Sequence, residues 1–286
     1  MPETASPASL AALLESAAAT LVRSGVREPR REAAALWRAL AGCSPGAAWI
    51  ERDSPAAPAL VDDFREAVAR RAAGAPASYA TGRAAFRTLD LVVDRRALIP
   101  RPETEGLVEL VLRWAVGKPG GVVADIGTGT GCIALALAME GRFERVIATD
   151  SSGEAAALAR ENVARVRPGV PVEVRVGNLL APLAAERCRV IVANPPYLTE
   201  AEWAALDPAV REFEPKAALA SGADGLAATR ALLSESPAVL EPGGLLALEI
   251  DERRPAAVRA LAHDAGWGHV TIHQDLFGRP RYALAV

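Results

Sequence analysis

The stretch Val122-Val123-Ala124-Asp125-Ile126-Gly127-Thr128-Gly129-Thr130-Gly131 decides which fold the chain can adopt. Its first three residues predict a buried strand, the alternating glycines predict a tight turn, and Ile133-Ala134-Leu135 predicts the helix that follows. This order brings the backbone close to a nucleotide-like ligand. The turn lacks the G-x-G-x-x-G spacing of dinucleotide sites and the Lys-Ser/Thr ending of a P-loop, and an acid leads it. A phosphate ligand is therefore disfavoured.

The units after the glycine turn repeat this pattern of strand and helix. The apolar run Val146–Thr149 predicts a second strand with Asp150 at its tip, where a carboxylate can accept hydrogen bonds from both hydroxyls of a ribose. Residues 172–176 predict a third strand, which leads into Gly177-Asn178. Successive units of this kind predict an α/β fold with a parallel, doubly wound sheet that binds its ligand across the strand tips.

The fourth predicted strand, residues 189–193, leads directly into Asn194-Pro195-Pro196-Tyr197. Two prolines stiffen this loop, because each ring fixes its own φ and restricts the residue before it. The loop therefore offers an amide oxygen, a backbone carbonyl and an aromatic face, which together suit a planar –NH2 group. A plain surface turn is the alternative, since Asn and Pro are ordinary turn residues.

Residues 1–75 predict a small helical N-terminal domain. The apolar spacing indicates three helices, and the second and third begin at Pro29 and Pro58. We expect Trp37 and Trp49 to belong to the core. Because no catalytic constellation is found here, a packing or substrate-docking domain is the better interpretation.

Residues 76–97 predict a β-hairpin linker, with Tyr79 and Phe86 among its strand-like residues. Residues 98–286 are then expected to form the larger domain, which contains the glycine turn and the Asn194 loop. Two strand-like runs near its C-terminus predict an antiparallel pair at the edge of the sheet.

Two segments are expected beside the site. In Leu98–Glu105, prolines bracket Arg101 and acids follow it, which holds polar groups beside a helix start; a simple proline-capped helix start is the alternative. Residues 198–224 are long for a connection, and long ordered loops often close over a site.

Composition narrows the class of protein. With 51% hydrophobic and 23% charged residues, the chain is expected to be globular and soluble. Its net charge is −3, so overall electrostatic attraction does not favour binding to nucleic acid. The three cysteines are isolated and the three histidines have no metal-ligand spacing, so we expect no metal site. We find no targeting segment or membrane-spanning run, and expect a cytoplasmic protein.

The glycine turn and the sheet resemble class I S-adenosylmethionine-dependent methyltransferases. Asn194–Tyr197 resembles their amino-methylating signature, which serves adenine-N6, cytosine-N4 and glutamine-amide methylation alike. Leu98–Glu105 is similar to a segment characteristic of peptide chain release factor glutamine N5-methyltransferases, and the resemblance covers nearly the whole chain. Further segments similar to that family are Glu28–Ala33, Phe213–Pro215, Asp224–Leu226, Leu248–Ile250 and Asp275–Arg279.

The resemblance implies S-adenosyl-L-methionine as the cofactor and S-adenosyl-L-homocysteine as its product. The implied cofactor contacts are Asp125, Gly127, Thr128, Gly129, Thr130, Gly131, Asp150, Asn178 and Asn194. The chain departs from the family at two positions. Asn178 stands where many relatives have an acid near the adenine, and Asp251 stands where glycine is usual.

The implied substrate is the glutamine of the GGQ motif of a peptide chain release factor. Asn194, Pro195, Pro196 and Tyr197 are the candidate catalytic residues and also candidate substrate contacts. The Asn194 side-chain oxygen and the Pro195 carbonyl would accept hydrogen bonds from the glutamine –NH2. The other candidate substrate contacts are Phe86, Arg101, Glu103 and Thr104. For Phe86, a place in the core of the hairpin is the alternative.

Three alternatives remain at this point. A nucleic-acid amino-methyltransferase would need a basic face or an added target-recognition segment. A ribosomal-protein glutamine methyltransferase is expected to have Pro-Arg-Ser-Pro where this chain has Pro100–Glu103. A non-catalytic binding module on the same scaffold would not need intact site residues. We therefore expect an enzyme that acts on release factors as a monomer, without nucleic acid or membrane as partner.

Overall fold

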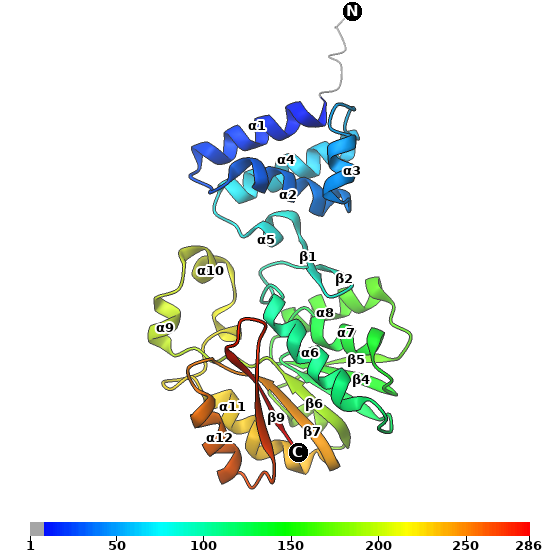
Figure 1. Ribbon diagram of the computed structural model, residues 1–286, viewed down its shortest axis with the longest axis vertical. Helices are drawn as coiled ribbons and strands as arrows, with labels where there is room; N and C mark the ends of the chain where they lie inside the picture. The colour runs from blue at the N-terminus through cyan, green and yellow to red at the C-terminus, as the bar shows by residue number, and fades with distance from the viewer. Residues whose placement is uncertain (1–8) are drawn as a thin grey trace, which may run out of the picture. The chain divides into compact units, whose positions relative to one another are not determined.

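The computed structural model divides the chain into two compact units, Met1–Ala84 and Ala85–Val286, and describes residues 9–286 (Figure 1). The boundary between the units falls inside the first strand. Each unit contains its own cluster of buried apolar side chains. The units are therefore described one at a time.

The N-terminal unit is helical. Its helices are α1 (Leu10–Arg23), α2 (Pro29–Ala41), α3 (Pro45–Ile50), α4 (Pro58–Ala72) and α5 (Ala77–Thr81). Helices α2 and α4 begin at the prolines that the sequence predicts. The sequence does not predict α3 and α5, because one or two turns are too short to establish an apolar period.

Aromatic packing forms the centre of this unit. Trp37 and Phe64 are buried, and their rings meet edge to face with centroids 5.4 Å apart. The prediction for Trp37 is confirmed. The prediction for Trp49 is wrong: its side chain is 68% exposed, and the Arg52 guanidinium lies over its ring. Helix α3 buries none of its residues, which explains the difference.

The hairpin consists of β1 (Arg83–Phe86) and β2 (Leu89–Val92), which pair in a two-stranded sheet. The prediction that Tyr79 is strand-like is wrong, because it lies in α5. Gly82 ends that helix with φ of +70°, a left-handed conformation that glycine adopts readily.

The larger unit is built on a seven-stranded sheet with strand order β5-β4-β3-β6-β7-β9-β8. Strands β3 to β7 pair in parallel, and β9 runs antiparallel to both of its neighbours. The predicted α/β fold with an antiparallel C-terminal strand is confirmed. The strands are β3 (Val122–Ile126), β4 (Arg145–Asp150), β5 (Val172–Val176), β6 (Cys188–Ala193), β7 (Leu240–Glu249), β8 (Val270–Gln274) and β9 (Pro280–Ala285).

Helices cover both faces of this sheet, as Figure 1 shows. Alternate residues of β3 point to opposite faces: Val123 packs with the helices α6, α7 and α8, whereas Ala124 packs with α11 and α12. Both faces are apolar, as expected of parallel strands buried on two sides. These helices are α6 (Pro102–Ala115), α7 (Cys132–Glu140), α8 (Gly153–Val166), α11 (Ala227–Glu235) and α12 (Pro255–Asp264).

The segment predicted to be loop-rich, residues 198–224, contains α9 (Glu200–Ala204) and α10 (Pro208–Phe213). Thr199 and Asp207 accept backbone hydrogen bonds at the starts of these helices, so short polar caps stabilise them. Single 3₁₀ turns occur at Ala181–Leu183, Lys216–Ala218 and Ser236–Ala238.

The two ends of that segment are held together. The backbone N–H groups of Tyr197 and Leu198 donate to the Leu219 carbonyl at 3.2 and 2.9 Å, and Ser221 N–H donates to the Leu198 carbonyl at 2.8 Å. Gly225 also lies against this point, because a Cβ added to it would collide with the Tyr197 carbonyl oxygen. We call this closed base of the segment the neck.

Between residues 9 and 286, no helix is both long and apolar enough to cross a membrane. In the same range, no three His, Cys, Asp or Glu side chains gather as a metal-ligand group would. Cys43, Cys132 and Cys188 are free thiols, and the last two are buried.

Candidate active site

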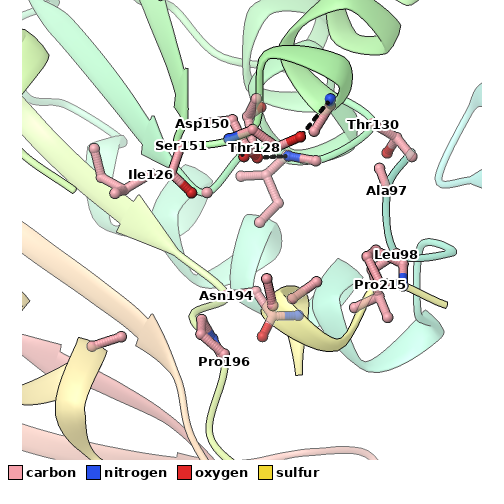
Figure 2. A pocket seen from close by; sticks show the side chains of 18 of the residues that line it. Ala97, Leu98, Ile126, Thr128, Thr130, Asp150, Ser151, Asn194, Pro196 and Pro215 are labelled. Atoms are coloured by element: carbon pink, nitrogen blue, oxygen red, sulfur yellow. Dashed lines mark hydrogen bonds between the residues drawn. The ribbon is translucent and has the colours of Figure 1, made fainter. Parts of the chain in front are cut away.

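A cavity of about 510 Å³ lies at the carboxyl ends of the central strands, the sheet edge that the sequence predicts for a ligand. Its walls come from the glycine turn, the tips of β4 and β5, the segment before α6, and residues that follow β6. Figure 2 shows Thr128 and Asp150 on one wall, and Asn194 with Pro196 on another. A volume of this size suits a small-molecule ligand.

The glycine turn is held by its own backbone. Gly127, Gly129 and Gly131 have φ of +71°, +55° and +83°, in the left-handed region that favours glycine. The N–H groups of Gly127 and Thr128 donate to the Thr149 carbonyl at 2.8 and 2.9 Å, and Gly131 N–H donates to the Thr128 carbonyl. These donors are not available to a phosphate. On its open side, Gly127 would leave an added Cβ with no protein atom within 4 Å.

Asp125 lies under the glycine turn and not in the cavity wall. Its side chain is fully buried, and Oδ2 accepts hydrogen bonds from the Thr128 hydroxyl at 2.6 Å and from Ala134 N–H at 3.1 Å. Burial raises the pKa of this carboxyl to about 7. Asp125 therefore ties the turn to the start of α7.

Asp150 and Asn178 both line the cavity, at the ends of β4 and β5. The Asp150 carboxylate accepts one backbone hydrogen bond on each oxygen, from Gly129 N–H and Ser152 N–H, both at 2.9 Å. Each carboxylate oxygen can accept a second hydrogen bond. The side chain is thus held in place and keeps acceptor capacity for hydroxyl groups.

Asn194 is oriented by residues far away in sequence. Its Nδ2 donates to the Thr104 hydroxyl at 3.0 Å, and that hydroxyl donates to Glu249 Oε2 at 2.7 Å. Thr104 and Glu249 are each 2% exposed. With Nδ2 occupied in this way, the Asn194 Oδ1 is the amide atom that remains as an acceptor.

Glu249 is a functional candidate that sequence reasoning did not single out. It ends β7, and burial raises the pKa of its carboxyl to about 7. The sequence contains it only as the middle of Leu248–Ile250. A buried acid at a strand end was the available signal, but nothing local to it indicates Thr104 as its partner.

Arg101 is paired and not free. Its guanidinium contacts the buried Glu214 carboxylate at 2.6 Å, and Ile99 N–H donates to the other oxygen of the same carboxylate at 3.3 Å. Glu214 therefore fixes the proline-rich segment before α6 against the segment after β6. Glu103 also takes part through its backbone, because its carbonyl accepts from the Tyr282 hydroxyl at 2.6 Å.

Tyr197 is held by its backbone at the neck. Its carbonyl accepts from Arg254 at 3.3 Å, and Arg254 also pairs with Asp251 and with Glu202. Asp251, which stands where glycine is usual in the family, also accepts a hydrogen bond from Arg253. Its carboxylate therefore lies between Arg253 and Arg254 at the turn before α12. Burial raises the pKa of the Tyr197 hydroxyl to about 12.

Ten of the predicted site residues line the cavity: Gly127, Thr128, Gly129, Thr130, Asp150, Asn178, Asn194, Pro196, Arg101 and Thr104. Six others, all within the described range, lie outside its lining: Asp125, Gly131, Pro195, Tyr197, Phe86 and Glu103. Phe86 is 1% exposed and packs in the apolar core beside Leu89 and Leu107. It is therefore a core residue of the larger unit, which is one of the two alternatives that the sequence left open for it.

Comparison with known proteins gives two family matches. Residues 107–263 match the methyltransferase small domain, and residues 12–82 match the PrmC N-terminal domain. The chain is 39% identical to a release factor glutamine methyltransferase of Cereibacter sphaeroides, over 95% of this chain and 96% of that one. Those of Xylella fastidiosa and Deinococcus radiodurans are 41% and 40% identical, over 93% and 96% of this chain and 96% of each relative.

The chain belongs to the release factor glutamine methyltransferase family. As a member of this family it is a methyltransferase whose methyl donor is S-adenosylmethionine. The sequence-based recognition of the family is confirmed.

Solved structures support the fold of this family member. A methyltransferase from Pyrococcus furiosus superimposes with a TM-score of 0.51 at 23% identity, over 70% of this chain and 89% of the other. The catalytic domain of hMettl16 gives a TM-score of 0.55 at 17% identity, over 80% and 81%. At these identities the likeness concerns the fold alone.

Proposed function

We propose that this family member transfers the methyl group of S-adenosylmethionine to the side-chain amide nitrogen (N5) of the glutamine in the GGQ motif of a peptide chain release factor. The relatives named for this activity match more than nine-tenths of the chain at about 40% identity. The observation that carries the proposal is the orientation of Asn194, whose Nδ2 is used by Thr104 so that Oδ1 remains an acceptor.

The residues of the cavity fit the cofactor. S-adenosylmethionine, when bound, supplies an electrophilic methyl group attached to a positively charged sulfur. Asp150 keeps acceptor capacity for the ribose hydroxyls, and the Asn178 amide oxygen can accept from the adenine amino group. The open side of Gly127 leaves room for a ligand along the glycine turn. Asp125, which lies outside the cavity lining, would support this turn from below.

Asn194 and Pro195 would position the substrate nitrogen. A primary amide nitrogen is a poor nucleophile, because its lone pair is delocalised into the carbonyl group. Two acceptors, Asn194 Oδ1 and the Pro195 carbonyl, would hold both hydrogens of the –NH2 group and so orient it for attack. Fixing both reactants in near-attack geometry supplies much of the rate acceleration. The methyl group replaces one amide hydrogen, which leaves as a proton.

The other residues of the loop and its surroundings would shape the approach of the substrate. Pro196 lines the cavity, and the backbone of the next residue, Tyr197, is held at the neck. Arg101 would act through its ion pair with Glu214. Thr104 would act through its hydrogen bonds to Asn194 and Glu249. We further propose that residues 1–75 dock the protein substrate, that 76–97 connect them to the catalytic domain 98–286, and that the enzyme acts as a cytoplasmic monomer without nucleic acid.

The test is methyl transfer from labelled S-adenosylmethionine to three separate acceptors. These are an intact release factor, the same factor with its GGQ glutamine changed to alanine, and duplex DNA. Label on the intact factor alone is the expected result. Label on DNA, or equal label on the alanine variant of the factor, would show that the proposed acceptor is wrong.

A further inference from the structure

Three side chains from three elements form one hydrogen-bonded chain: Asn194 after β6, Thr104 in the first turn of α6, and Glu249 at the end of β7. Strands β6 and β7 are neighbours, and Ala193 pairs with Leu248 in their register. Asn194 and Glu249 are the next residues on each strand, so they leave the sheet side by side. The Thr104 hydroxyl joins them, at 3.0 Å from Asn194 Nδ2 and 2.7 Å from Glu249 Oε2.

We propose that Glu249 and Thr104 are positioning residues that decide which end of the Asn194 amide faces the cavity. A hydroxyl has a single hydrogen to donate. Because Glu249 takes that hydrogen, the Thr104 oxygen can only accept from Asn194. The atom that faces Thr104 is then the –NH2 nitrogen, and the amide oxygen faces the other way.

This orientation matters because the two ends of an amide have similar size but opposite hydrogen-bonding character. If the Asn194 amide were turned over, its –NH2 would face the –NH2 of the substrate glutamine, and two donors would meet. Burial strengthens the effect, because Thr104 and Glu249 are each 2% exposed and water has little access to replace a lost partner. The inference rests on the proposed function, since it concerns the binding of an –NH2 group.

Protonation of Glu249 would reverse the direction of the hydrogen bonds that join Glu249, Thr104 and Asn194. Burial raises the pKa of Glu249 to about 7, and a protonated Glu249 donates to Thr104. The Thr104 hydroxyl hydrogen is then free to point at Asn194 and to favour the turned-over amide. Among the charged side chains around Glu249, Arg281 and Arg101 lower its pKa and Glu103 raises it. The titratable side chains of Tyr197, Tyr282 and Cys132 also face Glu249 and are neutral. We therefore expect kcat to fall as the pH drops through about 7.

The test compares two substitutions at Thr104 that differ in the hydroxyl. Thr104→Val keeps the shape and removes the hydroxyl, and Thr104→Ser keeps the hydroxyl. On an intact release factor, we expect Thr104→Val to lower kcat by about tenfold to a hundredfold, the loss typical when a residue that orients a functional side chain is removed. Thr104→Ser should stay within about threefold of the wild type. The KM for S-adenosylmethionine should stay near that of the wild type in both variants. Thr104→Val should lower the thermal midpoint without cofactor, because it leaves the buried Glu249 carboxylate and Asn194 Nδ2 without the Thr104 partner, so kcat is measured well below that midpoint.

Glu249→Gln is the second arm and does not depend on the folding of the valine variant. It should lower kcat and abolish the decrease of kcat at acid pH. Asp125 also titrates near pH 7, so a decrease that persists in Glu249→Gln would assign it to another group and overturn this inference. Wild-type kcat in Thr104→Val, or equal losses in the valine and serine variants, would overturn it too. A wild-type enzyme that does not methylate the release factor would instead refute the proposed function.

Discussion

Asp125 should make the stability of the apoprotein fall as the pH rises through about 7. Its carboxyl is fully buried and one oxygen has no hydrogen-bond partner among the described residues, so burial raises its pKa from 3.8 to about 7. The folded state therefore keeps a proton that the unfolded chain has released. Between these two values the free energy of unfolding decreases as the pH rises.

The size of the effect follows from the pKa difference. Between about pH 5.5 and the folded-state pKa of about 7, the folded protein holds one proton more than the unfolded chain. This span of about 1.5 pH units lowers the free energy of unfolding by roughly 2 kcal/mol at 1.36 kcal/mol per unit, and the difference levels off above about pH 7. Asp125→Asn removes the charge but can keep an oxygen where Oδ2 accepts from Thr128 and Ala134. It should therefore remove this part of the pH dependence.

The assay is urea unfolding of both proteins at several pH values, followed by circular dichroism without cofactor. The wild type should lose roughly 2 kcal/mol relative to Asp125→Asn between about pH 5.5 and about 8. Glu249 also has a raised pKa, but it is present in both proteins and cancels in the difference. Parallel stability curves for the two proteins would refute the reasoning about Asp125.

Three more predictions concern activity. Asn194→Ala should lower kcat, because the activation free energy of methyl transfer should rise by about 2 to 4 kcal/mol. The affinity for the cofactor, measured by calorimetry, should change little. Normal turnover would refute the role of Asn194. Asp150→Ala should weaken cofactor binding by about tenfold or more in the same titration, and unchanged affinity would exclude it from the ribose site. Leu276 and Phe277 are 102% and 76% exposed in the turn between β8 and β9, at the sheet edge where β7 also ends. Changing both to serine should raise the KM for the release factor by about tenfold, whereas Val116→Ser, at a site 79% exposed, should not; equal effects would remove the turn from the substrate surface.

The sequence predicts those parts of the fold that local patterns determine. The strand before the glycine turn, the helices that begin at Pro29 and Pro58, and the C-terminal antiparallel pair all follow from apolar period and turn residues. Such patterns need about two turns of helix before they become visible. The six-residue helix that carries Trp49 is shorter than that, and the exposure of this residue could not be anticipated.

The contacts that orient the site could not be predicted from local patterns. Thr104 and Asn194 are 90 residues apart, and Thr104 and Glu249 are 145 apart. These three side chains come together only because of the strand order and because the start of a helix packs beside the strand ends. Neither feature produces a periodic pattern in a single sequence. The sequence therefore predicts Asn194 as the acceptor but not Thr104 and Glu249, the residues that orient its amide.

The neck has a consequence for how this enzyme can vary in evolution. Backbone hydrogen bonds at Tyr197, Leu198 and Ser221 close the base of the segment. The residues between these bonds therefore form a closed loop, which we call the excursion. The length of this loop does not alter the path of the Asn194 loop. Within the excursion, Glu202 and Glu214 are anchored to arginines outside it. The residues between these two anchors are therefore where insertions and deletions can accumulate while the reacting groups keep their places.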